Sequence, residues 1–217
     1  MLAAAGAVLL LASCSSQPND LRDNRYYSDP ETTTATTPPS PSAAPRPVPA
    51  TATSARPKLR ELSLQALTGT DLAAEGVQPG TVEQTVMPKL PDCNVPLSDA
   101  RTGYQAVWTY PTGATLRQYV AQYGTAADGV VDSVLDGLKC GKYKAGGADM
   151  TVRAPVTAAD GQVSWCATSS KQATCTAMTA HGALLSVVTV SAATETKAQQ
   201  AVTRIAPLAA NALTRNS

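Results

Sequence analysis

The stretch that decides the fold is Gln162–Ser191, which reads QVSWCATSSKQATCTAMTAHGALLSVVTVS. Residues 162–168, 173–180 and 184–191 are rich in Val, Thr and other residues common in strands, and short turns separate them. Consecutive strands joined by short turns pair antiparallel, so this stretch predicts three neighbouring strands of an antiparallel sheet. The last of them, LLSVVTVS, is apolar enough to lie in the middle of the sheet.

Two cysteines of this stretch face each other if Ser170-Lys171 forms a two-residue hairpin loop. In that register Cys166 lies opposite Cys175, and facing residues in a hairpin are about 4.5–5.5 Å apart, which a disulfide can span. Cys93 and Cys140 then remain as a second pair. The four cysteines therefore predict two disulfides. A zinc site is the alternative, but the chain has no CxxC pair and only one His.

The segments before this stretch add further elements. Gly103–Tyr110 (GYQAVWTY) is predicted as a strand that ends at the turn Pro111-Thr112-Gly113. The next segment, Leu116–Tyr123, fits either a helical face or a returning strand, and the turn before it favours the strand. Asp149–Val156 is predicted as another strand. Thr70–Glu75, with a glycine directly after it, is predicted as a short helix.

Two longer amphipathic helices complete the predicted fold. Thr125–Leu138 carries one apolar stripe, and Thr125 with Asp128 forms a capping-box pattern at its start. A final helix runs from about Thr194 to Leu213, and Pro207 is expected to kink it or to end its regular part. Because both apolar stripes need a sheet face to cover them, the predicted fold class is α+β, an antiparallel sheet with helices packed on it.

The N-terminal segment predicts export and lipidation. Leu2–Leu11, LAAAGAVLLL, is too short to cross a hydrocarbon core of about 30 Å, but it has the length of the hydrophobic region of a signal peptide. The following Leu11-Ala12-Ser13-Cys14 resembles a bacterial lipobox, in which the cysteine is acylated and becomes the new N-terminus. We therefore predict a lipoprotein signal peptide over residues 1–13. A lipid anchor on Cys14 would hold the protein on the extracytoplasmic face of the cell membrane.

Composition divides the rest of the chain into two parts. Residues 14–57 hold nine of the 16 prolines, mixed with Thr, Ser and Ala, which predicts a disordered tether. Residues 58–217 are expected to form one extracytoplasmic domain. The whole chain has 17 basic and 16 acidic residues. This balance argues against a nucleic-acid partner, which would need a clustered basic excess.

The candidate ligand-binding residues are aromatic. If Gly103–Tyr110 and Leu116–Tyr123 are strands on either side of the turn, alternate aromatic residues share a face and can line a cleft for a glycan or a lipid. The alternative is that they supply core volume in a chain without Phe. The four candidates are Trp108, Tyr110, Tyr119 and Tyr123.

Other residues with reactive side chains have simpler interpretations. His181 stands between two predicted strands without a partner motif, so a surface histidine is expected. Asp128, Asp132 and Asp136 recur every four residues, as on the solvated face of a helix. Gly141–Gly147 is basic and Gly-rich, but it lacks the order of a phosphate loop and is interpreted as a mobile connection rather than an anion cradle. We therefore expect no catalytic, metal or cofactor site and no enzymatic activity.

The order of these features carries a resemblance to a known family. After the lipobox and the tether come Ala66-Leu67-Thr68 with Asp71-Leu72, then Pro91-Asp92-Cys93, Cys140, Trp165-Cys166, Cys175 and Leu184–Ser191 with the terminal helix. This order resembles the actinobacterial sensor-domain lipoproteins, which are similar to the extracellular sensor domain of mycobacterial serine/threonine protein kinase H. The resemblance implies an antiparallel sheet with helices, a large cleft and a ligand-sensing role. It also implies disulfides between Cys93 and Cys140 and between Cys166 and Cys175.

The predicted function is therefore sensor-like and non-catalytic. The extracytoplasmic domain is expected to bind an unidentified ligand or cell-wall component in a cleft that the two disulfides make rigid. One alternative is an envelope module that binds or inhibits another protein. A further alternative is an envelope hydrolase that uses Asp or Glu residues, which the sequence does not bring together.

Overall fold

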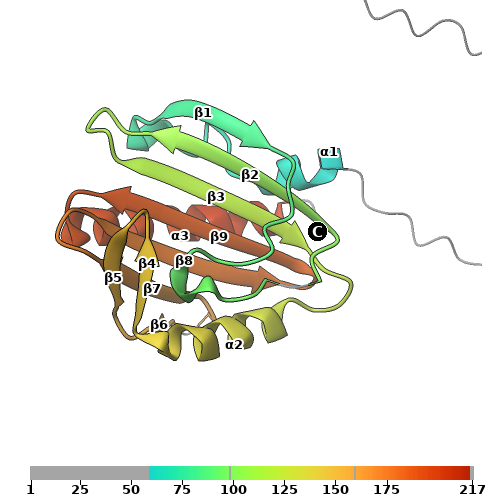
Figure 1. Cartoon of the computed structure of the whole chain (residues 1–217). Helices are drawn as coiled ribbons and strands as arrows, with labels where there is room; N and C mark the ends of the chain where they lie inside the picture. Colours follow the sequence, from blue (N-terminus) through green and yellow to red (C-terminus); the bar gives the residue numbers. More distant parts are fainter. Residues whose placement is uncertain (1–58, 98, 159, 216–217) are drawn as a thin grey trace, which may run out of the picture. The chain divides into compact units, whose positions relative to one another are not determined.

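A nine-stranded antiparallel sheet forms the centre of the fold (Figure 1). The computed structural model describes residues 59–215 except 98 and 159, so the predicted signal peptide, tether and lipid anchor on Cys14 lie outside the described residues. The strands are ordered β1-β2-β3-β9-β8-β7-β5-β4 across the sheet, and β6 pairs with β7 beside this path. Their bounds are Gln78–Glu83 (β1), Thr102–Thr109 (β2), Thr115–Gln122 (β3), Lys142–Ala145 (β4), Ala148–Val152 (β5), Val156–Thr157 (β6), Val163–Thr168 (β7), Ala173–His181 (β8) and Leu184–Ala192 (β9).

The three strands of the predicted meander are confirmed, with the predicted register. β7 and β8 pair so that Cys166 lies opposite Cys175, and a disulfide joins these residues across a Cα–Cα distance of 4.1 Å. β9 lies between β8 and β3, in the middle of the sheet as its apolar sequence predicts. The ambiguous segment Leu116–Tyr123 is a strand, because its residues pair with β2 on one side and β9 on the other.

The second predicted disulfide is also confirmed. Cys93 and Cys140 are joined across a Cα–Cα distance of 6.0 Å. Cys93 belongs to the short 3₁₀ helix η3 (Asp92–Asn94), and Cys140 ends the 3₁₀ helix η4 (Leu138–Cys140), which directly follows α2. This disulfide therefore ties the connection between β1 and β2 to the C-terminal end of α2, which comes later in the sequence.

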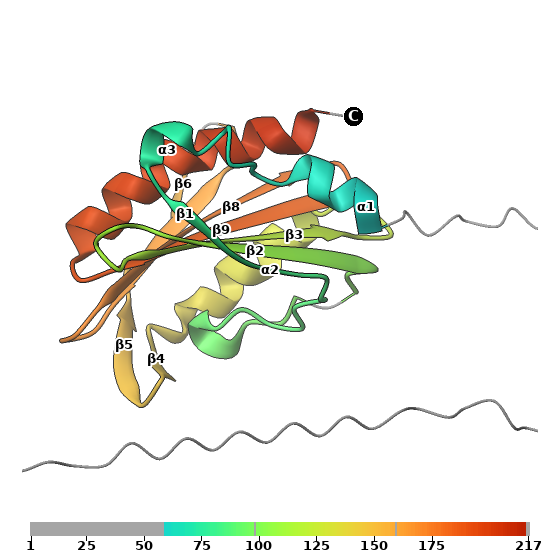
Figure 2. The same cartoon turned by 90° about the horizontal axis from the view of Figure 1, so that it is seen from above.

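Two helices cover opposite faces of the sheet (Figure 2). α3 (Glu195–Thr214) covers one face, together with the short elements α1 (Leu59–Leu62), η1 (Ser63–Gln65) and η2 (Ala73–Glu75). α2 (Asp128–Gly137) covers the other face, on the same side as the β4–β5 hairpin. The core is correspondingly divided between the two faces. One cluster, which contains Trp108 and Ile205, and a small one, which contains Leu62 and Leu213, lie on the α3 face, and a further cluster, which contains Tyr119, lies on the α2 face.

The start of α2 differs from the prediction, because no capping box forms. The helix begins at Asp128 after Ala127, and no side chain caps its N-terminus. Ala127 is fully buried, and its N–H donates to the carbonyl of Gly182 at 2.8 Å. The turn between β8 and β9 therefore fixes the start of the helix, and Thr125 is left exposed before it.

The Gly-rich segment Gly141–Gly147 also differs from the prediction, which was a mobile connection. It contains β4, which pairs with β5 along its whole length. Gly146 and Gly147 form the turn with φ values of 56° and 80°. A two-residue turn that matches the twist of a hairpin needs positive φ at both positions, which glycine adopts without strain. The two glycines therefore make a tight hairpin.

Three further differences come from proline. The predicted strand Asp149–Val156 is split into β5 and β6 before and after Pro155, which has no N–H to donate to a neighbouring strand. β1 was not predicted, because its sequence QPGTVE contains Pro79 and Gly80, and it is an exposed edge strand. α3 continues past Pro207 to Thr214, so the expectation that its regular part ends there is wrong. The buried residues beyond the proline, such as Ala209, keep this part of the helix packed on the core.

Candidate functional site

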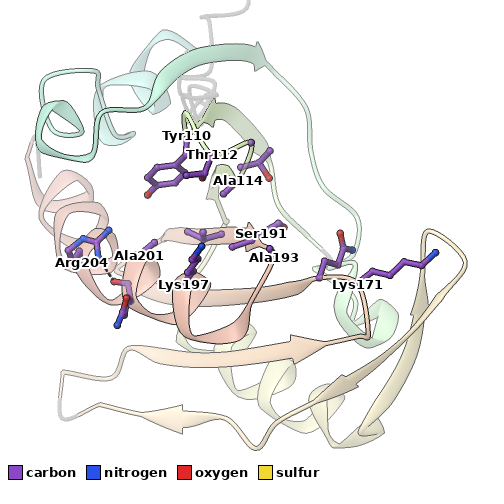
Figure 3. A pocket seen from close by; sticks show the side chains of 15 residues that line it. Tyr110, Thr112, Ala114, Lys171, Ser191, Ala193, Lys197, Ala201 and Arg204 are labelled. Carbon is purple, nitrogen blue, oxygen red and sulfur yellow. Dashed lines mark hydrogen bonds between the residues drawn. The ribbon is translucent and has the colours of Figure 1, made fainter.

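A cavity of about 540 Å³ opens at one end of the sheet (Figure 3). Its walls are the turn between β2 and β3, the tip of the β7–β8 hairpin, the end of β9 and the first half of α3. We call this cavity the large cleft. It is lined by Tyr110, Thr112, Gly113, Ala114, Thr115, Lys171, Gln172, Val190, Ser191, Ala192, Ala193, Lys197, Gln200, Ala201 and Arg204.

Short turns hold the walls of the large cleft in place. In the β2–β3 turn, the Tyr110 N–H donates to the Ala114 carbonyl at 2.8 Å, and Gly113 has a φ of 81° that suits glycine. At the tip of the β7–β8 hairpin, the Ser169 N–H donates to the Gln172 carbonyl at 2.9 Å. α3 begins directly after β9, with Thr194 as its N-cap. The cleft is therefore bounded by tight turns and a helix.

The charged side chains of the large cleft are basic. Lys171, Lys197 and Arg204 line it, and its lining contains no Asp or Glu. In Figure 3, Lys197 points from α3 into the cavity, whereas Lys171 extends away from it along the rim. Glu195 lies on the first turn of α3 but is already paired with Arg153, at an N–O distance of 2.6 Å. The cleft therefore offers cationic and neutral polar groups to a ligand.

A polar cluster fixes one wall of the large cleft. Arg204 donates from Nε and Nη2 to the two carboxylate oxygens of Glu75, each at 2.8 Å, and the Tyr110 hydroxyl donates to Glu75 Oε2 at 3.0 Å. The hydrogen bonds from Arg204 hold the pKa of Glu75 below its ordinary value, in spite of burial. Burial and the bond to Glu75 raise the pKa of Tyr110 far above its ordinary value, so its hydroxyl stays a donor. The cluster orients Tyr110 and Arg204 on the cleft.

A smaller cavity of about 130 Å³ lies on the α2 side of the sheet. We call it the second cavity. It shares Gln172 and Ser191 with the large cleft, so the two cavities meet at the same end of the sheet. It is lined by Met87, Leu90, Pro91, Asp92, Arg117, Tyr119, Tyr143, Ala145, Met150, Gln172, Thr174, Val187, Thr189 and Ser191.

Asp92 is the buried charged group of the second cavity, with 4% of its surface exposed. Trp165 Nε1 donates to Asp92 Oδ2 at 2.9 Å, and the Tyr143 hydroxyl donates to Asp92 Oδ1. Burial and the bond to Asp92 raise the pKa of Tyr143 far above its ordinary value, so this hydroxyl also stays a donor. These contacts tie η3 to β4 and β7.

The four predicted aromatic residues are divided between the two faces of the sheet. Trp108 and Tyr110 lie on the α3 side, and Tyr119 and Tyr123 lie on the α2 side. The two residues of each strand therefore share a face, but the two pairs lie on opposite faces. Tyr110 lines the large cleft, and Tyr119 lines the second cavity. Trp108 and Tyr123 line neither cavity and are buried core residues. One ligand site does not bring the four together.

Sequence analysis missed the polar lining of the large cleft on α3 and at the tip of the β7–β8 hairpin, and it missed Glu75 on η2, which contacts the lining residues Tyr110 and Arg204. Lys197, Gln200 and Arg204 are spaced by three and four positions, so a polar stripe beside the apolar face of the predicted helix was a usable signal. Glu75 gave no such signal, because it meets Arg204 from 129 positions earlier in the chain. Only the folded chain brings this pair together.

The remaining candidates lie on the surface. His181 is exposed at the end of β8, and Asp128, Asp132 and Asp136 are exposed on α2, as predicted. Within residues 59–215, leaving out 98 and 159, no group of three or more His, Cys, Asp or Glu side chains is placed to hold a metal ion. In the same part of the chain, no helix combines the length and the apolar character that a membrane-spanning helix needs.

Comparisons with known proteins bear on the fold. No family model and no curated protein sequence matches the chain. Among solved structures, the chain is similar to the crystal structure of the extracellular domain of PknH from Mycobacterium tuberculosis, with a TM-score of 0.55 and 16% sequence identity. The match covers 70% of this chain and 93% of that domain. The chain therefore shares the fold of that extracellular domain, and it has the antiparallel sheet, helices and two disulfides that the sequence predicts.

Proposed function

We propose that this protein is a cell-envelope lipoprotein whose extracytoplasmic domain binds a ligand in the large cleft and acts as a non-catalytic, sensor-like module. The observation that carries the proposal is the cleft itself, about 540 Å³ in volume and bounded by four separate segments of the fold. Cavities of this size are typical of small-molecule sites. The likeness to an extracellular domain supports an extracytoplasmic location, and the lipobox at Cys14 supports a lipid anchor.

The chemistry of the cleft favours binding over catalysis. Its lining contains hydroxyl, amide and cationic groups but no His, Cys, Asp or Glu that could serve as a general base for a neighbouring hydroxyl. The hydroxyl of Ser191 already contacts the hydroxyl of Thr174 at 3.3 Å. A lining of this kind can orient a polar or anionic ligand through hydrogen bonds and charge.

Native mass spectrometry of the domain purified from its own membrane tests the proposal. We expect a bound mass on the wild-type domain. Gln200 is an exposed residue of α3 that lines the cleft, and its neighbour Gln199 is exposed but does not line it. Gln200→Trp should lose the bound mass because the indole fills the cleft, and Gln199→Trp should keep it. A domain that carries no ligand and takes up none from envelope extracts, or an adduct that both variants keep, contradicts the proposal.

The lipid anchor has a separate test. Metabolic labelling with a palmitate analogue should label the wild-type protein, and Cys14→Ala should abolish the label and release the protein from the membrane fraction. A Cys14→Ala variant that stays labelled and membrane-bound contradicts the anchor without touching the cleft proposal.

A further inference from the structure

The second cavity contains a buried acid without a counter-ion among the described residues. Asp92 receives hydrogen bonds from two neutral donors, Trp165 and Tyr143, and none of the five ion pairs formed by the described residues includes it. A carboxylate has about four acceptor positions, so about two stay free. A buried charge without an opposite charge is costly, and a cationic group next to it removes much of that cost.

The other walls of the second cavity suit a compact organic body next to the acid. Tyr119 and Tyr143 are aromatic, and Met87, Leu90 and Met150 are apolar. Aromatic faces attract ammonium groups, and methionine adapts to irregular shapes. A volume of about 130 Å³ is similar to that of cavities that hold one benzene-sized molecule. The ligand that fits is therefore small, with a cationic group and a short apolar part.

The segment that presents Asp92 is held by several independent constraints. The next residue, Cys93, is disulfide-bonded to Cys140, and Cys93 and Asn94 have φ values of 55° and 53°. Two consecutive non-glycine residues in the left-handed region are strained, and such strain persists only where the surroundings impose it. The Val95 N–H also donates to the Asp92 carbonyl at 3.2 Å. The carboxylate is thus positioned before any ligand arrives.

One basic residue shares the second cavity with Asp92. Arg117 lines it from β3, is exposed, and forms none of the ion pairs found among the described residues. We propose that the second cavity binds a small zwitterion of the amino-acid type, whose ammonium group contacts Asp92 and whose carboxylate contacts Arg117. This site lies on the opposite face of the sheet from the large cleft, and the proposal does not depend on the function of that cleft.

Three probes that share one carbon skeleton distinguish the contributions of the ammonium group and the carboxylate to binding. Leucine carries both, isoamylamine only the ammonium group, and isovalerate only the carboxylate. Methyl NMR of methionine follows binding, because Met87 and Met150 line the second cavity, whereas Met178 is fully buried and does not line it. We expect leucine to shift the signals of Met87 and Met150 saturably, isoamylamine to do so at higher concentration, and isovalerate to leave them in place. The Met178 signal should not move.

Two substitutions assign the contacts. Asp92→Asn should weaken the binding of leucine and isoamylamine about ten-fold or more, because it removes the negative charge that strengthens the hydrogen bond from the ammonium group. Arg117→Gln should weaken the binding of leucine by up to about five-fold, as expected for the loss of an exposed ion pair. It should leave the affinity for isoamylamine unchanged or slightly higher.

A matched pair of variants covers the case in which Asp92→Asn fails to fold. Ala145→Leu fills the second cavity and leaves Asp92 in place, and Ala148→Leu adds the same side chain at the facing position of the hairpin, outside the lining. Ala145→Leu should abolish the leucine shifts and Ala148→Leu should keep them. The proposal is overturned by saturable isovalerate binding, by the absence of any leucine shift, or by leucine binding that Ala145→Leu leaves intact.

Discussion

The two faces of the sheet are covered in different ways. On one face, α3 is a continuous helix of 20 residues whose N-cap Thr194 accepts a hydrogen bond from the Lys197 N–H. On the other face, α2 has only 10 residues and no side-chain cap, and η3 and the β4–β5 hairpin lie beside it. The long helix is a regular element, whereas the opposite cover is assembled from short pieces that the Cys93–Cys140 disulfide and the contacts of Asp92 hold together. A cover made of short pieces therefore depends more on cross-links.

The largest effect is expected when each disulfide is removed in turn. Cys93–Cys140 spans 47 positions on the α2 side, and Cys166–Cys175 spans 9 positions within the α3-side core. Loop-closure entropy predicts a loss of about 4 kcal/mol for Cys93→Ala/Cys140→Ala and about 2.6 kcal/mol for Cys166→Ala/Cys175→Ala. Urea unfolding measures both losses. Hydrogen exchange should show that the first variant loosens α2 and η3 and leaves α3 protected. Equal losses, or loosening of α3, would show that the α2 face does not depend on its cross-link.

The next test shortens the side chain at the centre of the α3 contact. Ile205 is fully buried in the core cluster of that face. Ile205→Ala should lower the free energy of unfolding by about 3 kcal/mol, because it removes apolar contacts and leaves a cavity. Ile205→Val is the graded control and should cost about 1 kcal/mol. A loss below about 1 kcal/mol for the alanine variant would mean that packing does not hold α3 on the sheet.

The third test concerns the ionised link between η2 and α3. The Glu75 side chain is 8% exposed, and the hydrogen bonds from Arg204 keep its pKa below the ordinary value of 4.5. The stabilisation of ionised Glu75 is therefore fully present above that ordinary value and is lost as the pH falls through the lowered pKa. Glu75→Gln should cost about 1.5 kcal/mol at pH 7, as expected for hydrogen bonds to a charged group.

The pH dependence of this cost is the sharper measurement. Unfolding by urea at a series of pH values from 7 down to 3 should show the wild type and Glu75→Gln approaching each other below about pH 5. The control Glu61→Gln replaces an exposed glutamate and should follow the wild type at every pH. If the gap for Glu75→Gln stays constant over this range, the ionised pair does not provide the stabilisation.

The smallest expected effect is at the start of α3. Thr194→Ala removes the N-cap oxygen and should cost about 1 kcal/mol, and Thr194→Ser should restore most of it. No side-chain cap exists on α2, so Thr125→Ala should change the stability by less than about 0.5 kcal/mol. Thermal unfolding of the three variants measures the comparison. An equal loss for Thr125→Ala would mean that Thr125 does cap α2, as the capping-box pattern predicts.

The sequence predicted the parts of this fold that depend on neighbouring residues. The β7–β8 register followed from one two-residue loop, and it placed Cys166 opposite Cys175. β1 was missed because Pro79 and Gly80 disfavour strands, and the partner that accepts this edge strand is β2, which comes later in the chain. The pattern of residues within a segment does not indicate a strand whose pairing is imposed by the rest of the sheet.

The candidate site was harder to predict than the fold. The large cleft combines the β2–β3 turn, the β7–β8 hairpin and α3, and no local pattern joins them. Alternation correctly placed Trp108 and Tyr110 on one face, but it did not show that Tyr119 and Tyr123 belong to the other. The face on which Tyr119 and Tyr123 lie depends on whether the odd or the even positions of β3 share the face of Trp108. One residue more or less in the turn between β2 and β3 would exchange the two faces. In the structure Trp108 pairs with Leu116, so the even positions share its face.

The central position of β9 has a consequence for how the chain reaches its folded state. β2–β3, β7–β8 and β8–β9 are local hairpins, but β9, the last strand in the sequence, must also pair with β3, which ends much earlier in the chain. Pairings between distant segments form slowly, because the chain must first close a long loop. Until β3 and β9 pair, each of them has an open edge, and such edges promote aggregation. The C-terminal unit β9–α3 supplies the middle of the sheet and the cover of one face together, so a chain that lacks it would retain neither.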